Sequence, residues 1–528
     1  MLIFEVLFIL LTLLVLTKLN WSSLVPVPAK PLLIIAVIAA LLHLLVEGLR
    51  WQMLPAYCVF FGVAAFYLKN TQAQWFVRVL GAAMGTILLS VSILLISQFP
   101  IMALPAPQGQ YAVGTFSMTL LDEQRLERYA PQFNREVPLQ VWYSANKQDS
   151  QGLPRQSLFP QLYSGDYDLI SFLFGYLKRL KTHSVINAPI AQAPTAEAEA
   201  GTFPLIVFNH GLFFMSDHSP QLMEHLASNG YIVVSITHPF ESLKVSLPNM
   251  GTRLFSMEYP EDVGFTQDQL SDGGIGDKIG NIIGLEHSSL MAALYQQMDN
   301  YNAAKPADQQ GVISAALEMQ SLQILGELLT EDNLAAFFQI RTRVRNRSVA
   351  YWVEDIQFVL DQLPLLDAPI ENFSVSFDIS RIGALGYSYG GAAVGEFCKL
   401  DFRCAAGSNI DGTQFGANWN KPVQSPFLLI NSDSNPQGNN YAYYPAKENF
   451  FDIYIPNTLH QDLMDFLVVF PVLRTLGMSG TMQYQELANI VKDLELAFLD
   501  EFLKGKAGGL KEAIEKHSET VMVYALSK

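Results

Sequence analysis

A serine between two glycines is the short motif with the clearest chemistry in this chain. Residues 386–390 read Gly-Tyr-Ser-Tyr-Gly. Residues 381–385 before them, apolar from Ile382 onward, predict a buried strand, and the small residues after them predict a helix. A Gly-x-Ser-x-Gly segment in that setting is typical of a sharp turn that exposes the serine hydroxyl. Side chains at Gly386 and Gly390 would clash with the strand or the helix, so the motif predicts Ser388 as a nucleophile.

A serine hydroxyl is a weak nucleophile and needs a base, which an acid must orient. In sheets of this kind the acid and the histidine follow the serine along the chain. Two histidines do so, His460 and His517. His460 follows a strand-like run and opens a predicted helix, whereas His517 lies in a Lys- and Glu-rich helix typical of a surface. We therefore predict that His460 is the base.

Two aspartates are candidates for the acid, because each directly follows a predicted strand. Asp411 follows the strand at 404–410, and Asp433 comes shortly after the strand at 426–431. Either strand end can present a carboxylate to the histidine. The residue pattern alone leaves this choice open, and the other aspartate is then a turn residue.

An oxyanion formed during acyl transfer needs backbone N–H donors. One donor is expected from Tyr389, directly after the nucleophile. The other is expected from the turn at 209–213, after the buried strand at 203–209. In this turn we predict that His210 orients the loop rather than reacts. The spacing of the histidines and cysteines predicts no metal site, and nothing in the sequence calls for a cofactor.

The three cysteines are too few for a disulfide framework. Cys398 and Cys404 are six residues apart. They can pair only if the fold brings their side chains into bonding geometry.

Strands and helices alternate through the second part of the chain. The pattern predicts strands at 137–143, 203–209, 231–236, 381–385, 404–410 and 426–431, and helices at 221–229 and 353–363. Such alternation predicts an α/β fold with a mostly parallel sheet covered by helices on both faces. Residues 240–347 interrupt it. We expect them to form a helical lid at the carboxyl edge of the sheet, where sites of α/β proteins lie.

The first part of the chain is strongly apolar. Hydrophobic residues make up 50% of the whole sequence and charged residues only 16%. The excess is concentrated in four runs, at 2–16, 32–46, 55–68 and 79–97, of which the third is the weakest. We therefore predict a transmembrane domain of about four helices at 1–104 and a soluble domain at 105–528.

Charges near the ends of these runs predict the orientation. Lys18 and Lys30 flank the first loop, and Lys69 and Arg78 flank the third. Because positive loops stay in the cytoplasm, the second domain is expected on the extracytoplasmic side of a cell inner or plasma membrane. The net charge of −16 argues against a nucleic-acid partner.

Several segments together resemble one branch of the α/β-hydrolases, the platelet-activating-factor acetylhydrolase (group VII phospholipase A2) family. They are 203–239 with its His210-Gly211-Leu212, 402–404 running into 410–411, Leu459-His460-Gln461-Asp462 with Asp465-Phe466, and the segments 109–114 and 172–180. The resemblance spans about residues 109–469. Phe213 stands where the family usually has glycine, the 240–347 insertion is longer, and the four apolar runs are not a family feature.

The resemblance implies roles that the residues alone leave open. It places the acid on the strand after the nucleophile helix, which favours Asp411 over Asp433. It assigns the oxyanion amides to Leu212 and Tyr389. It also implies calcium-independent hydrolysis of short or oxidised acyl chains of phospholipids.

The sequence thus predicts a membrane-anchored serine ester hydrolase that acts through an acyl-enzyme on short acyl esters or lipid-like esters. One alternative is a general carboxylesterase or lipase with a non-phospholipid ester. Another is an inactive, hydrolase-like binding module.

Overall fold

The computed structural model describes residues 2–69, 75–193, 202–256, 331–366, 369–370, 373–374, 377–418, 421–434 and 449–526. Contacts divide the chain into two compact units. The first consists of Met1–Ala103 with two short segments, Tyr167–Leu180 and Val468–Thr475. The second contains the remaining residues, from Leu104 onward.

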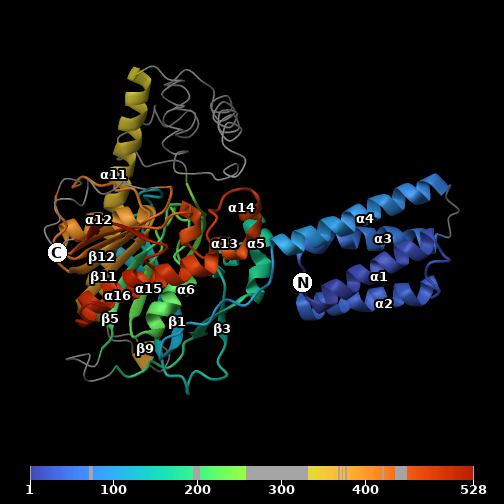
Figure 1. Cartoon of the computed structure of the whole chain (residues 1–528), viewed down its shortest axis with the longest axis horizontal. Helices are drawn as coiled ribbons and strands as arrows, with labels where there is room; N and C mark the ends of the chain where they lie inside the picture. Colours follow the sequence, from blue (N-terminus) through green and yellow to red (C-terminus); the bar gives the residue numbers. More distant parts are fainter. Residues whose placement is uncertain are drawn as a thin grey trace. The chain divides into compact units, whose positions relative to one another are not determined.

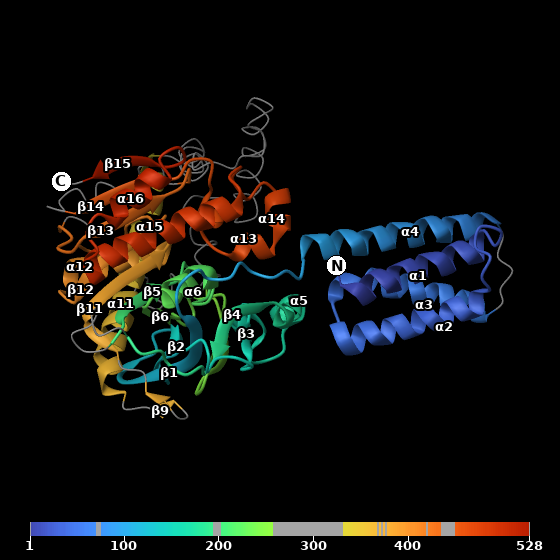
Figure 2. The same cartoon turned by 60° about the horizontal axis from the view of Figure 1, so that its bottom comes forward.

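Four helices make up the body of the first unit: α1 (Ile3–Asn20), α2 (Ala29–Leu42, extended by a π-helical turn to Glu47), α3 (Leu54–Leu68) and α4 (Trp75–Gln98). They run side by side in both views (Figures 1 and 2). All four are long and apolar enough to cross a membrane, α3 when counted from Trp51. The expectation of four such helices, including the weak third one, is confirmed.

A buried polar network closes one end of this bundle. Arg50 Nη1 lies 2.6 Å from Glu5 Oε1, and both side chains are almost completely buried. The Glu47 carboxylate accepts the main-chain N–H groups of Phe4 and Glu5 at 2.8 and 3.0 Å. These N–H groups belong to the first turn of α1, which has no intrahelical acceptors for them. The network therefore caps α1 from the end of α2.

The second unit is built on an eleven-stranded sheet with the order β15-β14-β13-β12-β11-β5-β6-β2-β1-β4-β3. The strands are β1 (Ala112–Leu126), β2 (Asn134–Ala145), β3 (Arg155–Ser157), β4 (Lys181–Ile186), β5 (Pro204–Asn209), β6 (Ile232–Ile236), β11 (Asp378–Tyr387), β12 (Cys404–Ile410), β13 (Phe427–Asn431), β14 (Phe450–Tyr454) and β15 (Met522–Leu526). The six neighbours from β14 to β6 are all parallel, and antiparallel strands flank them.

Helices cover both faces of this sheet (Figure 1). The helices α11 (Glu331–Gln362) and α12 (Tyr389–Leu400) contribute to the core on one face. The helices α6 (Pro220–Ser228), α15 (Tyr484–Lys504) and α16 (Gly509–Lys516) contribute to the core on the other. Strands β5 and β6 are fully buried, as their continuous apolar sequences require between two helical layers. The predicted fold class is confirmed.

The remaining α-helices and strands described outside the insertion are the short helices α5 (Leu169–Phe174), α13 (Phe466–Val469) and α14 (Pro471–Thr475) and a two-stranded ribbon, β9 (Pro369–Ile370) and β10 (Phe373–Ser374).

The predicted insertion at 240–347 is only partly described, because residues 257–330 lie outside the described ranges. Its first part is not helical. Strands β7 (Lys244–Leu247) and β8 (Gly251–Leu254) form an antiparallel hairpin. The turn contains Pro248 and Asn249, and Gly251 follows with a φ of 69°. These are turn-forming residues, so the expectation of helix was wrong here. The insertion returns to the sheet through α11.

Candidate active site

Ser388 lies in a tight turn between β11 and α12, with φ 55° and ψ −122°. A Cβ atom on Gly386 would lie 2.1 Å from the carbonyl oxygen of Gly390. A Cβ atom on Gly390 would lie 2.1 Å from the carbonyl oxygen of Asn209. Both distances are far below van der Waals contact, so the close passage of the strand, the helix and the β5 loop requires glycine at both positions. The positive φ at Ser388 turns its side chain out of the strand direction.

The structure brings three of the predicted residues into one hydrogen-bonded row. Ser388 Oγ lies 2.8 Å from His460 Nε2, and His460 Nδ1 lies 2.6 Å from Asp411 Oδ2. The Asp411 side chain is fully buried, whereas that of His460 is 29% exposed. An imidazole in this position can take the serine proton on one nitrogen while it donates from the other to the carboxylate.

Asp411 reaches His460 from the end of β12, and Ser432 after β13 holds it there. The Ser432 main-chain N–H donates to Asp411 Oδ1 and its hydroxyl donates to Oδ2, both at 2.7 Å. With His460, three donors therefore surround the carboxylate. This satisfies a buried charge and fixes its direction.

Asp433, the other candidate acid, is bound elsewhere. It accepts hydrogen bonds from the Tyr454 hydroxyl and from the main-chain N–H of Asn457. Burial raises its pKa, and the carboxylates of Asp411 and Asp462 add to that rise. Among the described contacts, the aspartate at His460 is Asp411.

Further residues hold the histidine itself. The main-chain N–H of His460 donates to Ser434 Oγ at 2.9 Å. The Tyr387 hydroxyl donates to the His460 carbonyl at 2.7 Å, and its ring stacks on the imidazole with centroids 4.9 Å apart. The sequence argument missed Ser432, Ser434 and Tyr387. The serines flank Asp433 in the chain, so the only available signal was their position at the end of a predicted strand.

The loop that follows β5 approaches Ser388 closely. A Cβ atom on Gly211 would lie 3.1 Å from the Cβ of Ser388. The next residue, Leu212, has no acceptor for its main-chain N–H among the described residues. The N–H of Phe213, by contrast, donates to the carbonyl of Glu241 at 2.9 Å. Of these two amides, Leu212 is the one that can serve an oxyanion.

Tyr389, whose amide is the second predicted donor, is the first residue of α12. Its main-chain N–H therefore belongs to the first turn of the helix, where the partial positive charge of the helix dipole favours an anion. The two predicted oxyanion residues thus lie on opposite sides of the turn that carries Ser388.

His517 lies away from this row. It follows the end of α16, and its Nε2 lies 2.8 Å from Oδ2 of Asp493 on α15. Among the residues that the structure describes, no group of three histidine, cysteine or acidic side chains is arranged to hold a metal ion.

Cys398 and Cys404 form a disulfide, with their Cα atoms 5.1 Å apart. The pairing that the sequence left open therefore occurs. The bond links the last turn of α12, which begins after Ser388, to the first residue of β12, which ends before Asp411. It connects the two elements that present the serine and the aspartate.

Comparisons with known proteins agree with this architecture. The family "Platelet-activating factor acetylhydrolase, isoform II" matches residues 339–518, and the family "Chlorophyllase" matches residues 160–239. The platelet-activating factor acetylhydrolase of Cavia porcellus is 25% identical over 423 residues, which cover 78% of this chain and 80% of that protein. The chain is an α/β-hydrolase that resembles the platelet-activating-factor acetylhydrolases. The same enzyme of Canis lupus familiaris is 24% identical over 420 residues, covering 76% of this chain and 77% of the relative.

A solved structure supports the fold of this hydrolase independently. The ferulic acid esterase from Streptomyces cinnamoneus superimposes with a TM-score of 0.53 at 20% sequence identity. The superposition covers 81% of this chain and all of the esterase chain. The predicted resemblance is therefore confirmed, and the matches support a hydrolase of the esterase type.

Proposed function

We propose that this protein is a membrane-anchored serine ester hydrolase with Ser388, His460 and Asp411 as its catalytic residues. The observation that carries the proposal is the continuous row from Ser388 Oγ through the imidazole to the Asp411 carboxylate, with contacts of 2.8 and 2.6 Å. Both contacts lie within hydrogen-bond reach, as proton transfer from a nucleophile to its base requires.

The proposed reaction has two steps. His460 Nε2 takes the hydroxyl proton as Ser388 Oγ attacks the ester carbonyl, and Asp411 stabilises the resulting imidazolium. The amides of Leu212 and Tyr389 bind the oxyanion of the tetrahedral intermediate. When the intermediate collapses, His460 passes the proton to the leaving alkoxide. Water then hydrolyses the acyl-enzyme with the same groups, and no cofactor is needed.

We propose short acyl chains of phospholipids or similar lipid esters as the substrate class. Support comes from the two acetylhydrolase relatives, whose similarity to this chain extends over more than three quarters of their length. The second candidate is a general carboxylesterase. It is favoured by the match of residues 160–239 to a family named for another ester, because these residues include the loop at 209–213, the proposed oxyanion loop. Rates on p-nitrophenyl esters of increasing chain length, together with a platelet-activating-factor analogue, separate the two.

We also propose that the hydrolase unit lies outside the cytoplasm. Two independent features support this orientation. Lys18, Lys30, Lys69 and Arg78 flank the first and third loops of the helical bundle, and positively charged loops favour the cytoplasmic side. The Cys398–Cys404 disulfide is a bond typical of oxidising compartments. Arg50, the positive residue of the second loop, is buried against Glu5, so it does not act as a loop charge.

Labelling with a fluorophosphonate probe tests nucleophile and orientation together. The wild type should label, Ser388→Ala should not, and the control Ser380→Ala, on the same strand β11, should label like the wild type. Loss of the nucleophile should lower turnover by several orders of magnitude. In intact cells, a membrane-impermeant probe should reach Ser388. Full esterase activity in Ser388→Ala would overturn the mechanism, and labelling only after lysis would overturn the orientation.

A further inference from the structure

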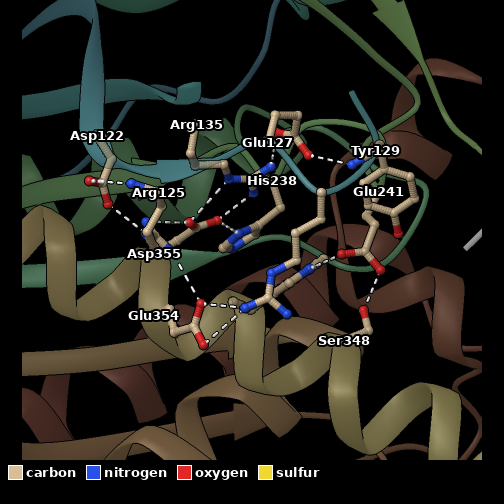
Figure 3. Close-up of polar contacts among 12 residues, drawn as sticks. Asp122, Arg125, Glu127, Tyr129, Arg135, His238, Glu241, Ser348, Glu354 and Asp355 are labelled. Carbon is tan, nitrogen blue, oxygen red and sulfur yellow. Dashed lines mark hydrogen bonds and ion pairs between the residues drawn. The ribbon is translucent and has the colours of Figure 1, made fainter. Parts of the chain in front are cut away.

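Behind the oxyanion loop lies a buried group of aromatic and charged residues that the proposed reaction does not use. His210, His238 and Trp352 are fully buried, and so is Asp355. His210 and His238 follow strands β5 and β6, whereas Trp352 and Asp355 lie on α11. Figure 3 shows Asp355 between Arg135 and His238.

Two contacts fix the protonation of His210. Its Nε2 lies 3.1 Å from the main-chain N–H of His238, which can only donate. Nε2 must therefore be an unprotonated acceptor, and the single ring proton lies on Nδ1. Nδ1 is 2.7 Å from the carbonyl oxygen of Gly211, to which it donates. Burial and the neighbouring His238 lower the pKa of His210 well below its ordinary value, which agrees with a neutral ring.

The carbonyl that His210 holds belongs to the same peptide group as the Leu212 N–H. In a trans peptide the C=O and N–H bonds point in opposite directions, and the chain has no cis peptide bond among its described residues. A donor that pulls the Gly211 oxygen to one side therefore sets the direction of the Leu212 N–H on the other.

The following peptide is held as well. The Phe213 N–H donates to the Glu241 carbonyl at 2.9 Å. The Glu241 carboxylate accepts the Trp352 indole N–H at 2.7 Å and the Ser348 hydroxyl. Both donors lie on α11. Leu212 is thus fixed on its N-terminal side by His210 and on its C-terminal side by Glu241.

Helix α11 supports the other end of the same arrangement. Asp355 Oδ2 accepts from His238 Nδ1 at 2.9 Å and from Arg135 at 2.6 Å. The Trp352 indole stacks on the His238 ring with centroids 3.8 Å apart, and its edge contact with the Tyr389 ring is 5.0 Å. Trp352 therefore contacts His238, whose main-chain N–H binds His210, and also Tyr389, which carries the second predicted oxyanion amide.

We propose that His210 is a positioning residue for the oxyanion hole, and that α11 fixes the hole through Trp352 and Asp355. His210 touches no reacting atom. It acts by holding one peptide group in the direction that the transition state needs. Because α11 is the segment by which the 240–347 insertion returns to the sheet, the insertion is connected to the chemistry through this helix. The inference rests on the proposed serine hydrolase function.

Two substitutions that both introduce a side-chain amide distinguish this positioning role from a merely structural one. In His210→Asn the side-chain amide lies near the position of Nδ1 and can still donate to Gly211. In His210→Gln the amide reaches the position of Nε2, so it keeps the contact with His238 and loses the one with Gly211. The control is His225→Gln, at a buried histidine of α6. Thermal unfolding shows which variants are folded.

The readout is kcat/KM on a p-nitrophenyl ester and on its thionoester, in which sulfur replaces the carbonyl oxygen. Sulfur is a poor hydrogen-bond acceptor, so an intact oxyanion hole favours the ester strongly. We expect His210→Gln to lose about 10- to 100-fold in kcat with little change in KM, because a misplaced donor forfeits much of its effect. Its preference for the ester should fall. His210→Asn should retain more of the turnover and more of the ester preference than His210→Gln, and His225→Gln should match the wild type.

Trp352→Phe tests the helix. It keeps an aromatic ring against His238 and removes the donor to Glu241, so kcat and the ester preference should both fall several-fold. Full activity in His210→Gln, an Asn variant no better than the Gln variant, or an unchanged ester preference would overturn the role of His210. Wild-type behaviour in Trp352→Phe would overturn the role of α11. These failures are distinct from failure of the proposed function, which would appear as activity in Ser388→Ala.

Discussion

Replacing Asp411 by asparagine should nearly abolish turnover, because it reverses the tautomer of His460. Asp411 accepts three hydrogen bonds, one at Oδ1 and two at Oδ2. In Asp411→Asn the new NH2 group cannot occupy the Oδ1 position, where the fixed main-chain N–H of Ser432 points at it from 2.7 Å. The NH2 group must therefore take the Oδ2 position.

At the Oδ2 position the Ser432 hydroxyl can rotate to accept, but His460 Nδ1 faces a donor at about the former contact distance of 2.6 Å. The imidazole must then carry its proton on Nε2, which points at Ser388 Oγ. A protonated Nε2 cannot take the serine proton. A wrong tautomer in an otherwise intact site costs about 10⁴ in kcat, which corresponds to about 5 kcal/mol of barrier.

The assay compares kcat on p-nitrophenyl acetate for Asp411→Asn, Asp433→Asn and the wild type in detergent, with thermal unfolding as the folding control. Asp433 contacts Tyr454 and Asn457, so its variant should keep turnover within a few-fold of the wild type. The reasoning would be refuted by a folded Asp411→Asn that retains a large part of its turnover. A larger loss in Asp433→Asn than in Asp411→Asn would refute it equally.

Three further predictions concern stability. Burial raises the pKa of Glu495 from 4.5 to about 8. The stability that the protonated carboxyl contributes is therefore fully present below pH 4.5 and is lost as the pH rises through about 8. Glu495→Gln should have a higher Tm than the wild type at pH 8, and this stability advantage should shrink toward pH 5 by about 1.4 kcal/mol per pH unit. Replacing Cys398 and Cys404 together by serine should cost about 2 kcal/mol, as expected for a six-residue loop, with kcat retained. Arg50→Met should destabilise the detergent-solubilised protein by about 3–5 kcal/mol, because it leaves Glu5 buried without its partner, and adding Glu5→Gln should restore much of that loss.

Clear results would contradict each of these. A Tm advantage of Glu495→Gln that is the same at both pH values would mean that the carboxyl does not retain its proton on folding. Serine variants as stable as the oxidised wild type would mean that the disulfide contributes nothing. Equal stability of Arg50→Met and the wild type would exclude a buried pair with Glu5.

The local elements that carry the proposed chemistry were recognisable from the sequence. The apolar residues from Ile382 to Leu385 before the turn and the small residues after Ser388 favour a buried strand followed by a helix, and the structure has both. The four apolar runs likewise favoured helices, because a helix satisfies its backbone polar groups internally in apolar surroundings. The central strands β5, β6, β12 and β13 were recognisable because strands buried on both faces are mostly apolar.

Other elements had no such local signal. The predicted strand at 137–143 is the middle of β2, which runs from Asn134 to Ala145, because its ends are defined by pairing with β1 rather than by their own residues. The hairpin at β7 and β8 was expected as helix, although Pro248 and Asn249 mark a turn there. The extent of a strand depends on packing against its neighbours more than on the propensity of its own residues.

The tertiary structure shows which aspartate meets the histidine, a choice that the residue pattern left open and that only the family resemblance favoured. Asp411 and Asp433 each follow a strand of the same sheet, and the residue pattern treats them alike. The register of β12 against β13 brings Ser432 to Asp411, and the turn after β14 brings His460 to the same carboxylate. The support of His210 by α11 has the same origin. Both depend on side chains from elements far apart in the chain, whose distances only the packed sheet and its helices fix.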